Sequence, residues 1–294
     1  MAESPAHKFG QIIGEVIEAA IEPLLRKFAH THRLFLDKKG PRPARSGRKV
    51  SWVDLYGNTH DLDFVLEKGG SPSKIGRPVA FIETAWRRYT KHSRNKAQEI
   101  QGAILPLVAT HQNAAPFIGV VLAGVFTGGS LTQLRSLGFT VLYFPHETVV
   151  QAFRRAGIAA HFDEHTAVAE FIRKVRAWEA LSARERQQVA QALVRINSKE
   201  IQNFMGTLER VVSRQVAVVR ILPLHGKASE WDSVDKAIVF IERYDEGERS
   251  QPVLRYEIQI RYTNSDRIEG QFADKQAAIQ FLKSYQAPPL RPAS

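Results

Sequence analysis

The sequence has no cysteine, which excludes a disulfide framework, a metal site built from thiolates and a cysteine nucleophile. It also lacks an apolar run long enough to cross a membrane as a helix. The longest runs, such as 117–126, reach about half of the roughly 20 residues required. The first residues carry neither the basic start nor the apolar core of a secretory signal. We therefore expect a cytoplasmic protein with no membrane segment.

Acidic residues are in the minority among the charged ones: 30 Asp and Glu stand against 41 Lys and Arg, and the net charge is +11. Such an excess favours a polyanionic partner, either nucleic acid or an anionic membrane surface. The 294 residues are 44% hydrophobic, close to the globular average, which excludes disorder of the whole chain. This length suits one large domain or two modest ones, each with its own core.

The first half of the sequence has the pattern of an α/β domain. Apolar residues recur at helical spacing or in short runs typical of strands, and glycine with asparagine marks a tight turn at 56–59. The predicted elements are a helix at 8–30, strands at 49–55, 60–67 and 79–85, a helix at 93–110, a strand at 117–126, a helix at 130–137 and a strand at 139–144. This order predicts a mixed sheet flanked by helices, in a domain that spans 1–163.

The pattern changes twice after this domain. Residues 164–213 have helical periodicity throughout, and from 216 onward the period becomes two. We therefore expect a helical connector over 164–213 and a small α+β module over 214–294. The elements predicted for this module are strands at 216–222, 236–243, 254–262 and 267–272 and a helix at 275–285. We find no internal repeat.

Carboxylates interrupt two predicted strands of the first domain. Along 60–67, Asp61 and Asp63 share one face, so strand alternation alone cannot decide between them. Glu83 stands in the middle of the apolar run 79–85, and a carboxylate buried there needs a metal ion, Arg or Lys as its partner. An aspartate and a glutamate on neighbouring strands can bracket a divalent cation. Because Mg²⁺ prefers such oxygen ligands, we expect a site for Mg²⁺, with Mn²⁺ as its substitute.

Two basic segments accompany these acids. The loop 38–49 carries six Lys or Arg and no acid, and the stretch 86–98 carries five together with Trp86 and Tyr89. They predict a surface that contacts the phosphates of a nucleic acid. The residues expected to make these contacts are Arg45, Arg48, Arg87, Arg88, Lys91 and Arg94.

In the order of their elements and in the pair Asp63 and Glu83, residues 8–145 resemble the PD-(D/E)XK nuclease superfamily, the fold of restriction endonucleases. The resemblance implies that Asp63 is the aspartate of the motif, because the apolar run 64–66 follows it. It implies that Glu83 is the second acid of the motif. Both residues would then bind the metal ion.

The sequence departs from the family's motif at two positions. Ala85 stands where the family has lysine, and Leu62 precedes the aspartate where the family has proline. The family tolerates relocation of this lysine to the following helix, which implies Lys96 as the catalytic lysine, with Lys91 and Arg88 as weaker candidates. The resemblance also implies a metal ligand on the first helix, Glu15 or alternatively Glu18, and a polar residue on the second helix, Gln98.

The resemblance implies a Mg²⁺-dependent DNA endonuclease, in its most concrete form a type II restriction enzyme or a related phage-defence nuclease. Such enzymes commonly act as homodimers, because two antiparallel strands suit a two-fold pair of sites. The missing motif lysine keeps two different functions open. One is that of a catalytically inactive nuclease-like protein that binds nucleic acid, and the second is that of an adaptor subunit of a defence or repair complex.

Overall fold

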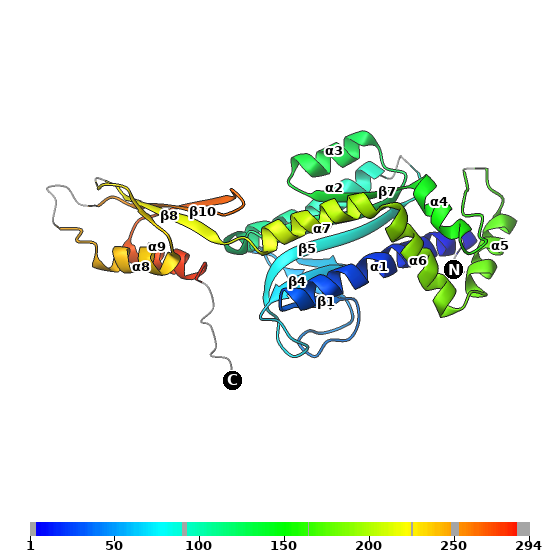
Figure 1. The fold of residues 1–294 in the computed structure, drawn as a ribbon, viewed down its shortest axis with the longest axis horizontal. Helices are drawn as coiled ribbons and strands as arrows, with labels where there is room; N and C mark the ends of the chain where they lie inside the picture. The colour runs from blue at the N-terminus through cyan, green and yellow to red at the C-terminus, as the bar shows by residue number, and fades with distance from the viewer. Residues whose placement is uncertain (1–3, 90–92, 164, 225, 248–252, 287–294) are drawn as a thin grey trace. The chain divides into compact units, whose positions relative to one another are not determined.

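The computed structural model describes residues 4–89, 93–163, 165–224, 226–247 and 253–286 (Figure 1). The chain forms two compact units, unit 1 over Met1–Val212 and unit 2 over Ser213–Ser294. Among the described helices, none combines the length and the apolar character that crossing a membrane requires.

Unit 1 is built on a five-stranded sheet. In spatial order its strands are β1 (Leu34–Lys38), β4 (Phe64–Lys68), β5 (Arg77–Arg87), β6 (Phe117–Gly124) and β7 (Thr140–Pro145). Pairing is antiparallel from β1 to β5 and parallel from β5 to β7. The parallel strand β6 is buried along its whole length, as its uninterrupted apolar sequence predicts. The predicted α/β class and mixed sheet flanked by helices are confirmed.

Helices cover both faces of this sheet (Figure 1). One face packs against α2 (Ser93–Thr110) and α3 (Gly128–Ser136), which cross between the parallel strands, and against a hairpin of β2 (Val50–Val53) and β3 (Thr59–Leu62). The short 3₁₀ turn Gln112–Ala114 follows α2. The opposite face packs against α1 (Pro5–Thr31), α4 (His146–Arg154), α5 (Val168–Glu179), α6 (Ala183–Ile196) and α7 (Ser198–Val212).

The expected connector over 164–213 is part of unit 1. Its three helices bury apolar faces against α1 and the sheet, so that Phe171, Trp178 and Phe204 belong to one hydrophobic core with Phe9 of α1. Two phenylalanines make this contact direct: the ring centroids of Phe9 and Phe171 are 6.3 Å apart. Buried faces of this kind remove apolar surface from water, which a free connector would leave exposed.

The strand expected at 60–67 is two strands. The chain bends at Asp63, where β3 of the hairpin ends and β4 of the large sheet begins. Phe64, Val65 and Leu66 are consecutive and all buried. β4 is covered on both faces, with Phe64 and Leu66 in one hydrophobic cluster and Val65 in the other. Buried and exposed side chains therefore do not alternate along this strand.

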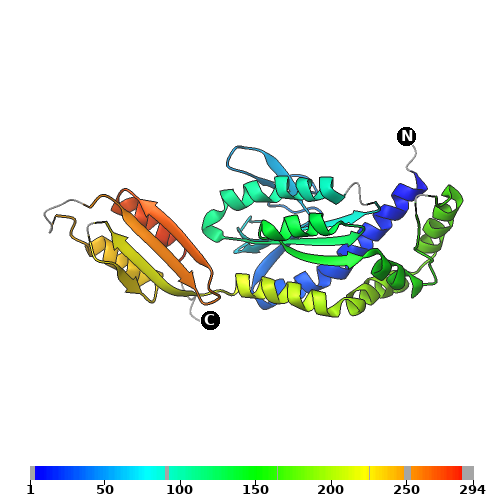
Figure 2. The same cartoon turned by 90° about the horizontal axis from the view of Figure 1, so that it is seen from above.

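Unit 2 is a four-stranded antiparallel sheet with two helices on one face (Figure 2). Its elements are β8 (Val216–Pro223), β9 (Ser229–Trp231), α8 (Val234–Arg243), β10 (Tyr256–Tyr262), β11 (Arg267–Phe272) and α9 (Lys275–Lys283), and the strand order is β11-β10-β8-β9. The strand predicted at 236–243 is wrong, because this segment is α8. Ser233 caps the helix through the backbone N–H of Lys236, and its buried residues follow helical spacing.

The two halves of unit 2 repeat one arrangement, a hairpin followed by a helix, which corrects the expectation of no repeat. The two helices carry the same residues at the same spacing, and both begin at a side-chain cap. Ala237, Ile238, Phe240 and Tyr244 of α8 correspond to Ala278, Ile279, Phe281 and Tyr285, in and just after α9. The strands of the two halves differ in sequence, so the repeat becomes evident only from the order of elements.

Candidate functional site

A cavity of about 790 Å³ in unit 1 is lined by six of the candidate residues that the sequence singles out: Glu18, Asp63, Glu83, Arg87, Arg88 and Lys96. Its walls come from α1, the end of β5, the start of α2 and segments outside these elements. The lining residues include Gly10, Gly14 and Glu18 of α1; Glu83 to Arg87 of β5, with Arg88 and Tyr89 directly after the strand; Asn95, Lys96 and Glu99 of α2; Asp63 at the bend; and Phe162.

Asp63 is fixed in this cavity by the residue that follows Glu83. The backbone N–H and the hydroxyl of Thr84 both donate to Asp63 Oδ2, at 2.7 Å and 2.6 Å. The antiparallel pairing of β4 with β5 sets this neighbourhood, because Phe64 lies opposite Ile82. Asp63 is half-buried, and its carboxylate is oriented before any ligand arrives. The sequence offers no signal for this role of Thr84.

Glu83 is the most strongly perturbed acid of the cavity. Its side chain is only 14% exposed, and Oε2 has no hydrogen-bond partner among the described residues. Burial raises the pKa of Glu83 to about 8, with the negative charge of Asp63 as a further cause and Lys96 acting in the opposite direction. A cation bound here would neutralise the carboxylate and coordinate its unpartnered oxygen, so this environment favours cation binding.

Lys96 lies where the relocated lysine is expected. Its Nζ is 3.8 Å from Glu83 Oε1 and 2.6 Å from Glu99 Oε1, and the side chain is only 11% exposed. The structure therefore brings Asp63, Glu83 and Lys96 into one cavity from three separate elements. Glu99 is a contact that the sequence prediction missed, although its position three residues after Lys96 on a helix was a usable signal.

The first-helix acid in this cavity is Glu18 and not Glu15. Burial raises the pKa of Glu18, and Asp63 adds to the effect. Glu15 is exposed and lines a separate pocket with Trp178. The reason is helical geometry: Gly10, Gly14 and Glu18 recur every four residues and share a face, from which Glu15 is turned away.

Asp61 and Gln98, both considered for the site, lie away from the cavity. Asp61 is exposed and accepts from Lys49 Nζ and Ser51 Oγ, both at 2.6 Å, which lowers the pKa of its carboxyl. Gln98 is exposed on α2 and does not contribute to the lining. Asp61 belongs to the small hairpin of β2 and β3, so the bend at Asp63 separates the two aspartates that alternation could not.

The cations expected to contact nucleic acid have different roles. Arg87 lines the cavity, with Nη2 3.7 Å from Glu99 Oε2. Arg88 also lines it, but its guanidinium lies over the rings of Phe162 and Phe171 and donates to the carbonyl oxygen of Asp163 at 2.7 Å. Arg94 is exposed on the first turn of α2. The remaining cation of this stretch, Lys91, lies outside the described residues.

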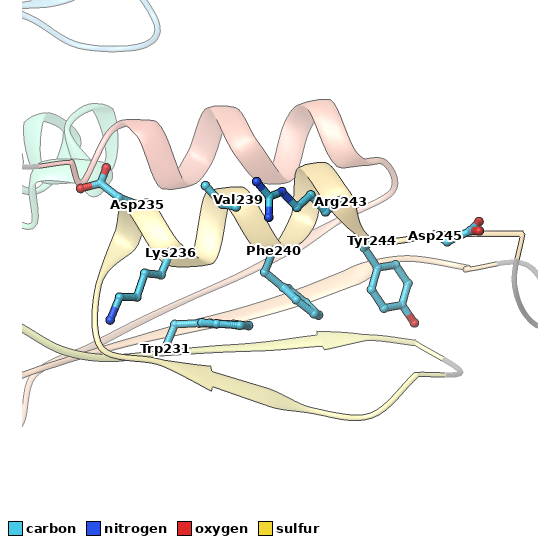
Figure 3. A pocket seen from close by; sticks show the side chains of 8 residues that line it. All are labelled: Trp231, Asp235, Lys236, Val239, Phe240, Arg243, Tyr244 and Asp245. Atoms are coloured by element: carbon cyan, nitrogen blue, oxygen red, sulfur yellow. The ribbon is translucent and has the colours of Figure 1, made fainter.

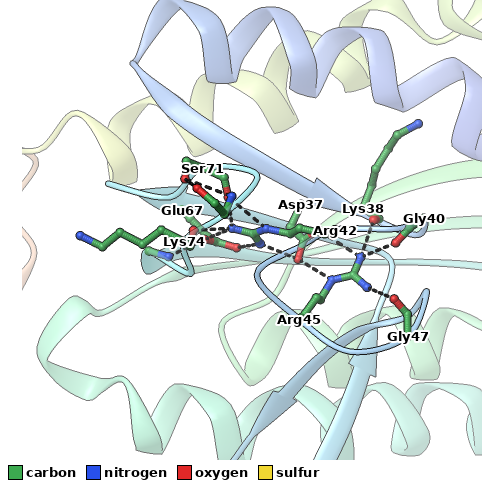
Figure 4. A network of polar contacts seen from close by, with 11 residues as sticks. Asp37, Lys38, Gly40, Arg42, Arg45, Gly47, Glu67, Ser71 and Lys74 are labelled. Carbon is green, nitrogen blue, oxygen red and sulfur yellow. Dashed lines mark hydrogen bonds and ion pairs between the residues drawn. The ribbon is translucent and has the colours of Figure 1, made fainter.

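Two of the six cations of the basic loop, Arg42 and Arg45, belong to a buried ion-pair network (Figure 4). Arg42 donates to Asp37 at 2.8 Å and to Glu67 at 2.6 Å, and all three side chains are at most 4% exposed. Arg45 is 8% exposed; it donates to Asp37 and to the carbonyl oxygens of Lys38, Gly40 and Gly47.

Arg45 is therefore not available to a nucleic acid, and its expected role is wrong. Its cationic group holds the loop in shape, because burying Asp37 without a partner would be costly. Arg48 of the same loop is exposed. Arg45 and Arg48 occur in one basic run, so only the tertiary fold shows that Arg45 is buried in the ion-pair network and Arg48 is exposed.

Over the residues that the structure describes, no three His, Asp or Glu side chains stand close enough together to hold a metal ion by themselves. The cavity fits a Mg²⁺ ion through fewer protein ligands, because Mg²⁺ commonly uses one or two carboxylates and completes its shell with water and substrate phosphate. Glu83 Oε2 is a buried oxygen without a partner in the described chain, and Asp63 lines the same cavity. Glu18 lines it as well.

No family model matches the sequence, and no curated protein matches it. Among solved structures, the chain is similar to the crystal structure of a protein of unknown function, AF1548, with 8% sequence identity and a TM-score of 0.28. The match covers 65% of this chain and 98% of that chain. A TM-score this low carries no argument about fold or function.

Proposed function

We propose that unit 1 is a Mg²⁺-dependent endonuclease that hydrolyses phosphodiester bonds of DNA, in the manner of type II restriction and related phage-defence enzymes. One observation carries the proposal. The carboxyl group of Glu83 is buried with an unpartnered oxygen, in a cavity that it shares with Asp63, Glu18 and Lys96. Acids that would bind a metal ion thus lie beside a lysine, the combination that phosphodiester hydrolysis uses.

The order of elements in unit 1 supports the PD-(D/E)XK-like interpretation. The first helix is followed by the antiparallel strands β1, β4 and β5, a second helix, and the parallel strand β6. Glu83 lies on β5 and Asp63 at the bend directly before β4, an arrangement that is compatible with the acids of the motif. The sequence departs from the family's motif at Leu62 and Ala85. Lys96 on α2 lies beside Glu83 and can replace the lysine that is missing at position 85.

Each residue has a chemical task in this proposal. Bound Mg²⁺ would activate a water molecule and stabilise the charge that develops on the phosphate. Glu83 and Asp63 would hold the ion, and Thr84 keeps Asp63 oriented through two hydrogen bonds. Lys96 places a positive charge next to Glu83, where it can orient the attacking water and offset the charge of the scissile phosphate.

The charge distribution supports DNA as the substrate. Unit 1 contains 29 Lys and Arg against 19 Asp and Glu, a net charge of +10. Arg87 lies at the cavity, Arg94 is exposed on α2, and Arg48 is exposed on the basic loop. Cations of this kind attract a phosphate backbone from any sequence, and the carboxylates then hold the metal ion against it.

The test is incubation of the purified protein with unmethylated phage DNA, in Mg²⁺ and in EDTA, beside Glu83→Gln. We expect discrete fragments that require Mg²⁺ and a cleavage rate that falls at least about 100-fold in the variant. Sedimentation of the same samples reports whether the active species is a homodimer. Uncut DNA with salt-sensitive binding retained would refute the nuclease proposal and favour an inactive DNA-binding protein.

A further inference from the structure

Unit 2 contains a cavity of about 600 Å³ that the nuclease proposal does not use (Figure 3). Trp231 of β9 and Val239, Phe240 and Arg243 of α8 line it, together with Tyr244 just beyond the helix. In Figure 3 the rings of Trp231, Phe240 and Tyr244 follow one another between the helix and the strands. By area the lining is mainly apolar, and the charged residues Asp235, Lys236 and Asp245 also border the cavity. A pocket of this kind accepts apolar side chains or ring systems.

The aromatic row itself belongs to the repeated architecture. Ring centroids of Trp231 and Phe240 are 5.2 Å apart, and those of Phe240 and Tyr244 are 5.5 Å apart. In the second half of the repeat, the corresponding distances are 4.7 Å for Phe272 and Phe281 and 5.0 Å for Phe281 and Tyr285. The rings therefore serve the packing of both halves, and their presence alone indicates no ligand.

The rims of the two halves differ in composition. Val239 is 42% exposed at the rim of the first half, and Gln280 occupies the corresponding position of the second half. Arg243 corresponds to Ser284 in the same way. Val239 continues the apolar lining of the cavity to the surface, whereas the glutamine at the equivalent position is polar.

The cavity borders the free edge of a sheet. β9 is an outermost strand, and in the described part of the chain it pairs with β8 alone, from Ser229 opposite Ile221 to Trp231 opposite Val219. The outward backbone groups of such a strand can pair with an added strand. A strand added there would point alternate side chains toward α8, where the cavity lies, which is the geometry of peptide recognition by β-augmentation.

Charge selects the occupant. Unit 2 contains 12 Lys and Arg against 11 Asp and Glu, a net charge of only +1, which gives little attraction for DNA. Glu230 is exposed at the centre of β9. A second copy that paired around the centre of the same edge would set Glu230 against Glu230, and like charges directly opposite are unfavourable. A strand with Lys or Arg opposite Glu230 is favoured instead.

We propose that this groove binds an extended segment of a partner protein, which adds a strand to β9. The segment has a Lys or Arg opposite Glu230, and apolar residues on either side of this cation insert into the cavity beside Val239. The proposal rests on unit 2 alone and is independent of the nuclease activity proposed for unit 1.

The experiment selects linear peptides of about 12 residues from a random display library on the immobilised full-length protein. We expect enrichment of an apolar, basic, apolar pattern at consecutive positions, since alternate residues face the cavity. In fluorescence anisotropy, Val239→Glu should weaken binding of the enriched peptides by about tenfold or more, because it places a charge in the apolar groove. Glu230→Lys should change the selected central residue from Lys or Arg to Asp or Glu.

Gln280→Glu is the matched control, since it places the same charged side chain at the equivalent position of the repeat. It should leave peptide affinity unchanged, and an equal loss in both variants would overturn the proposal. So would the absence of an enriched pattern. Two further outcomes would overturn the proposal in favour of a different occupant of the groove. A dimer in sedimentation that Val239→Glu dissociates would indicate a second copy of the chain. Displacement of the peptide by duplex DNA would indicate nucleic acid.

Discussion

Unit 1 carries a net charge of +10 and unit 2 a net charge of +1, so almost the whole basic excess of the chain lies in one unit. The acids are also placed differently. Asp37, Asp54 and Glu67 are buried in unit 1, whereas none of the acids described in unit 2 is buried. The cations of unit 1 favour a polyanionic partner, whereas a nearly neutral surface suits contact with another protein. One substitution pair sharpens the description of unit 1, and three further pairs compare the two units.

The largest expected effect separates two aspartates of unit 1. Asp63→Asn should lower the rate of DNA cleavage at least about 100-fold, because Asp63 lies in the cavity with Glu83. Asp61→Asn should leave the rate within about twofold, since Asp61 is an exposed partner of Lys49. A single-turnover cleavage assay measures both. Equal losses in the two variants would contradict the assignment of Asp63.

The second effect compares one ion pair from each unit. Arg42→Ala should lower the free energy of unfolding by about 3–5 kcal/mol, because it leaves Asp37 and Glu67 buried without their cation. Lys236→Ala in unit 2 removes an exposed pair with Asp232, and we expect a much smaller change because water screens this pair. Urea unfolding followed by circular dichroism measures each change. Similar losses would show that burial does not distinguish the two pairs.

The third effect is a dependence of stability on pH. The pKa of Glu83 rises from 4.5 to about 8 on folding, so between these values the folded chain binds more protons than the unfolded chain. This group therefore stabilises the fold below about pH 4.5 and loses that contribution as pH rises through about 8, at up to about 1.4 kcal/mol per pH unit. Glu83→Gln should remove this decline in metal-free buffer.

Asp232 of unit 2 provides a control, because its contribution to stability changes with pH in the opposite direction. Lys236 lowers the pKa of Asp232, so the stability that this carboxylate contributes is lost as the pH falls, not as it rises. Asp232→Asn should therefore lower the unfolding midpoint slightly at neutral pH and converge with wild type at acid pH, where Asp232 itself is protonated. Thermal unfolding from about pH 2 to about pH 9 distinguishes the two variants. A Glu83→Gln curve parallel to wild type would refute the raised pKa of Glu83.

The smallest effect concerns single exposed cations. Arg94→Ala should weaken DNA binding modestly and reduce the slope of log affinity against log salt by about 1, as the loss of one phosphate contact does. Arg243→Ala in unit 2 should change neither value, because it lies at the groove proposed for a peptide. Binding titrations at several salt concentrations measure this. A reduced slope for Arg243→Ala would extend the DNA surface to unit 2.

Much of the fold and part of the site follow from local pattern. Apolar runs and helical periodicity predict the helices at 8–30 and 93–110 and the buried strand at 117–126, which agree with the observed elements to within a few residues. Glu83 is conspicuous because a carboxylate inside an apolar strand is costly, and it is mostly buried. Lys96 follows from the resemblance, and it does lie beside Glu83.

By itself, then, the sequence determined the α/β class of unit 1, the excess of positive charge and an inward-facing acid on an apolar strand. Only the tertiary structure decided between Asp63 and Asp61, between Glu18 and Glu15, and which arginine of the loop is buried. The physical reason is shared by these cases. Neighbouring residues have nearly the same local pattern, and a bend, a helical turn or an ion pair formed across long sequence distances sends them to different environments.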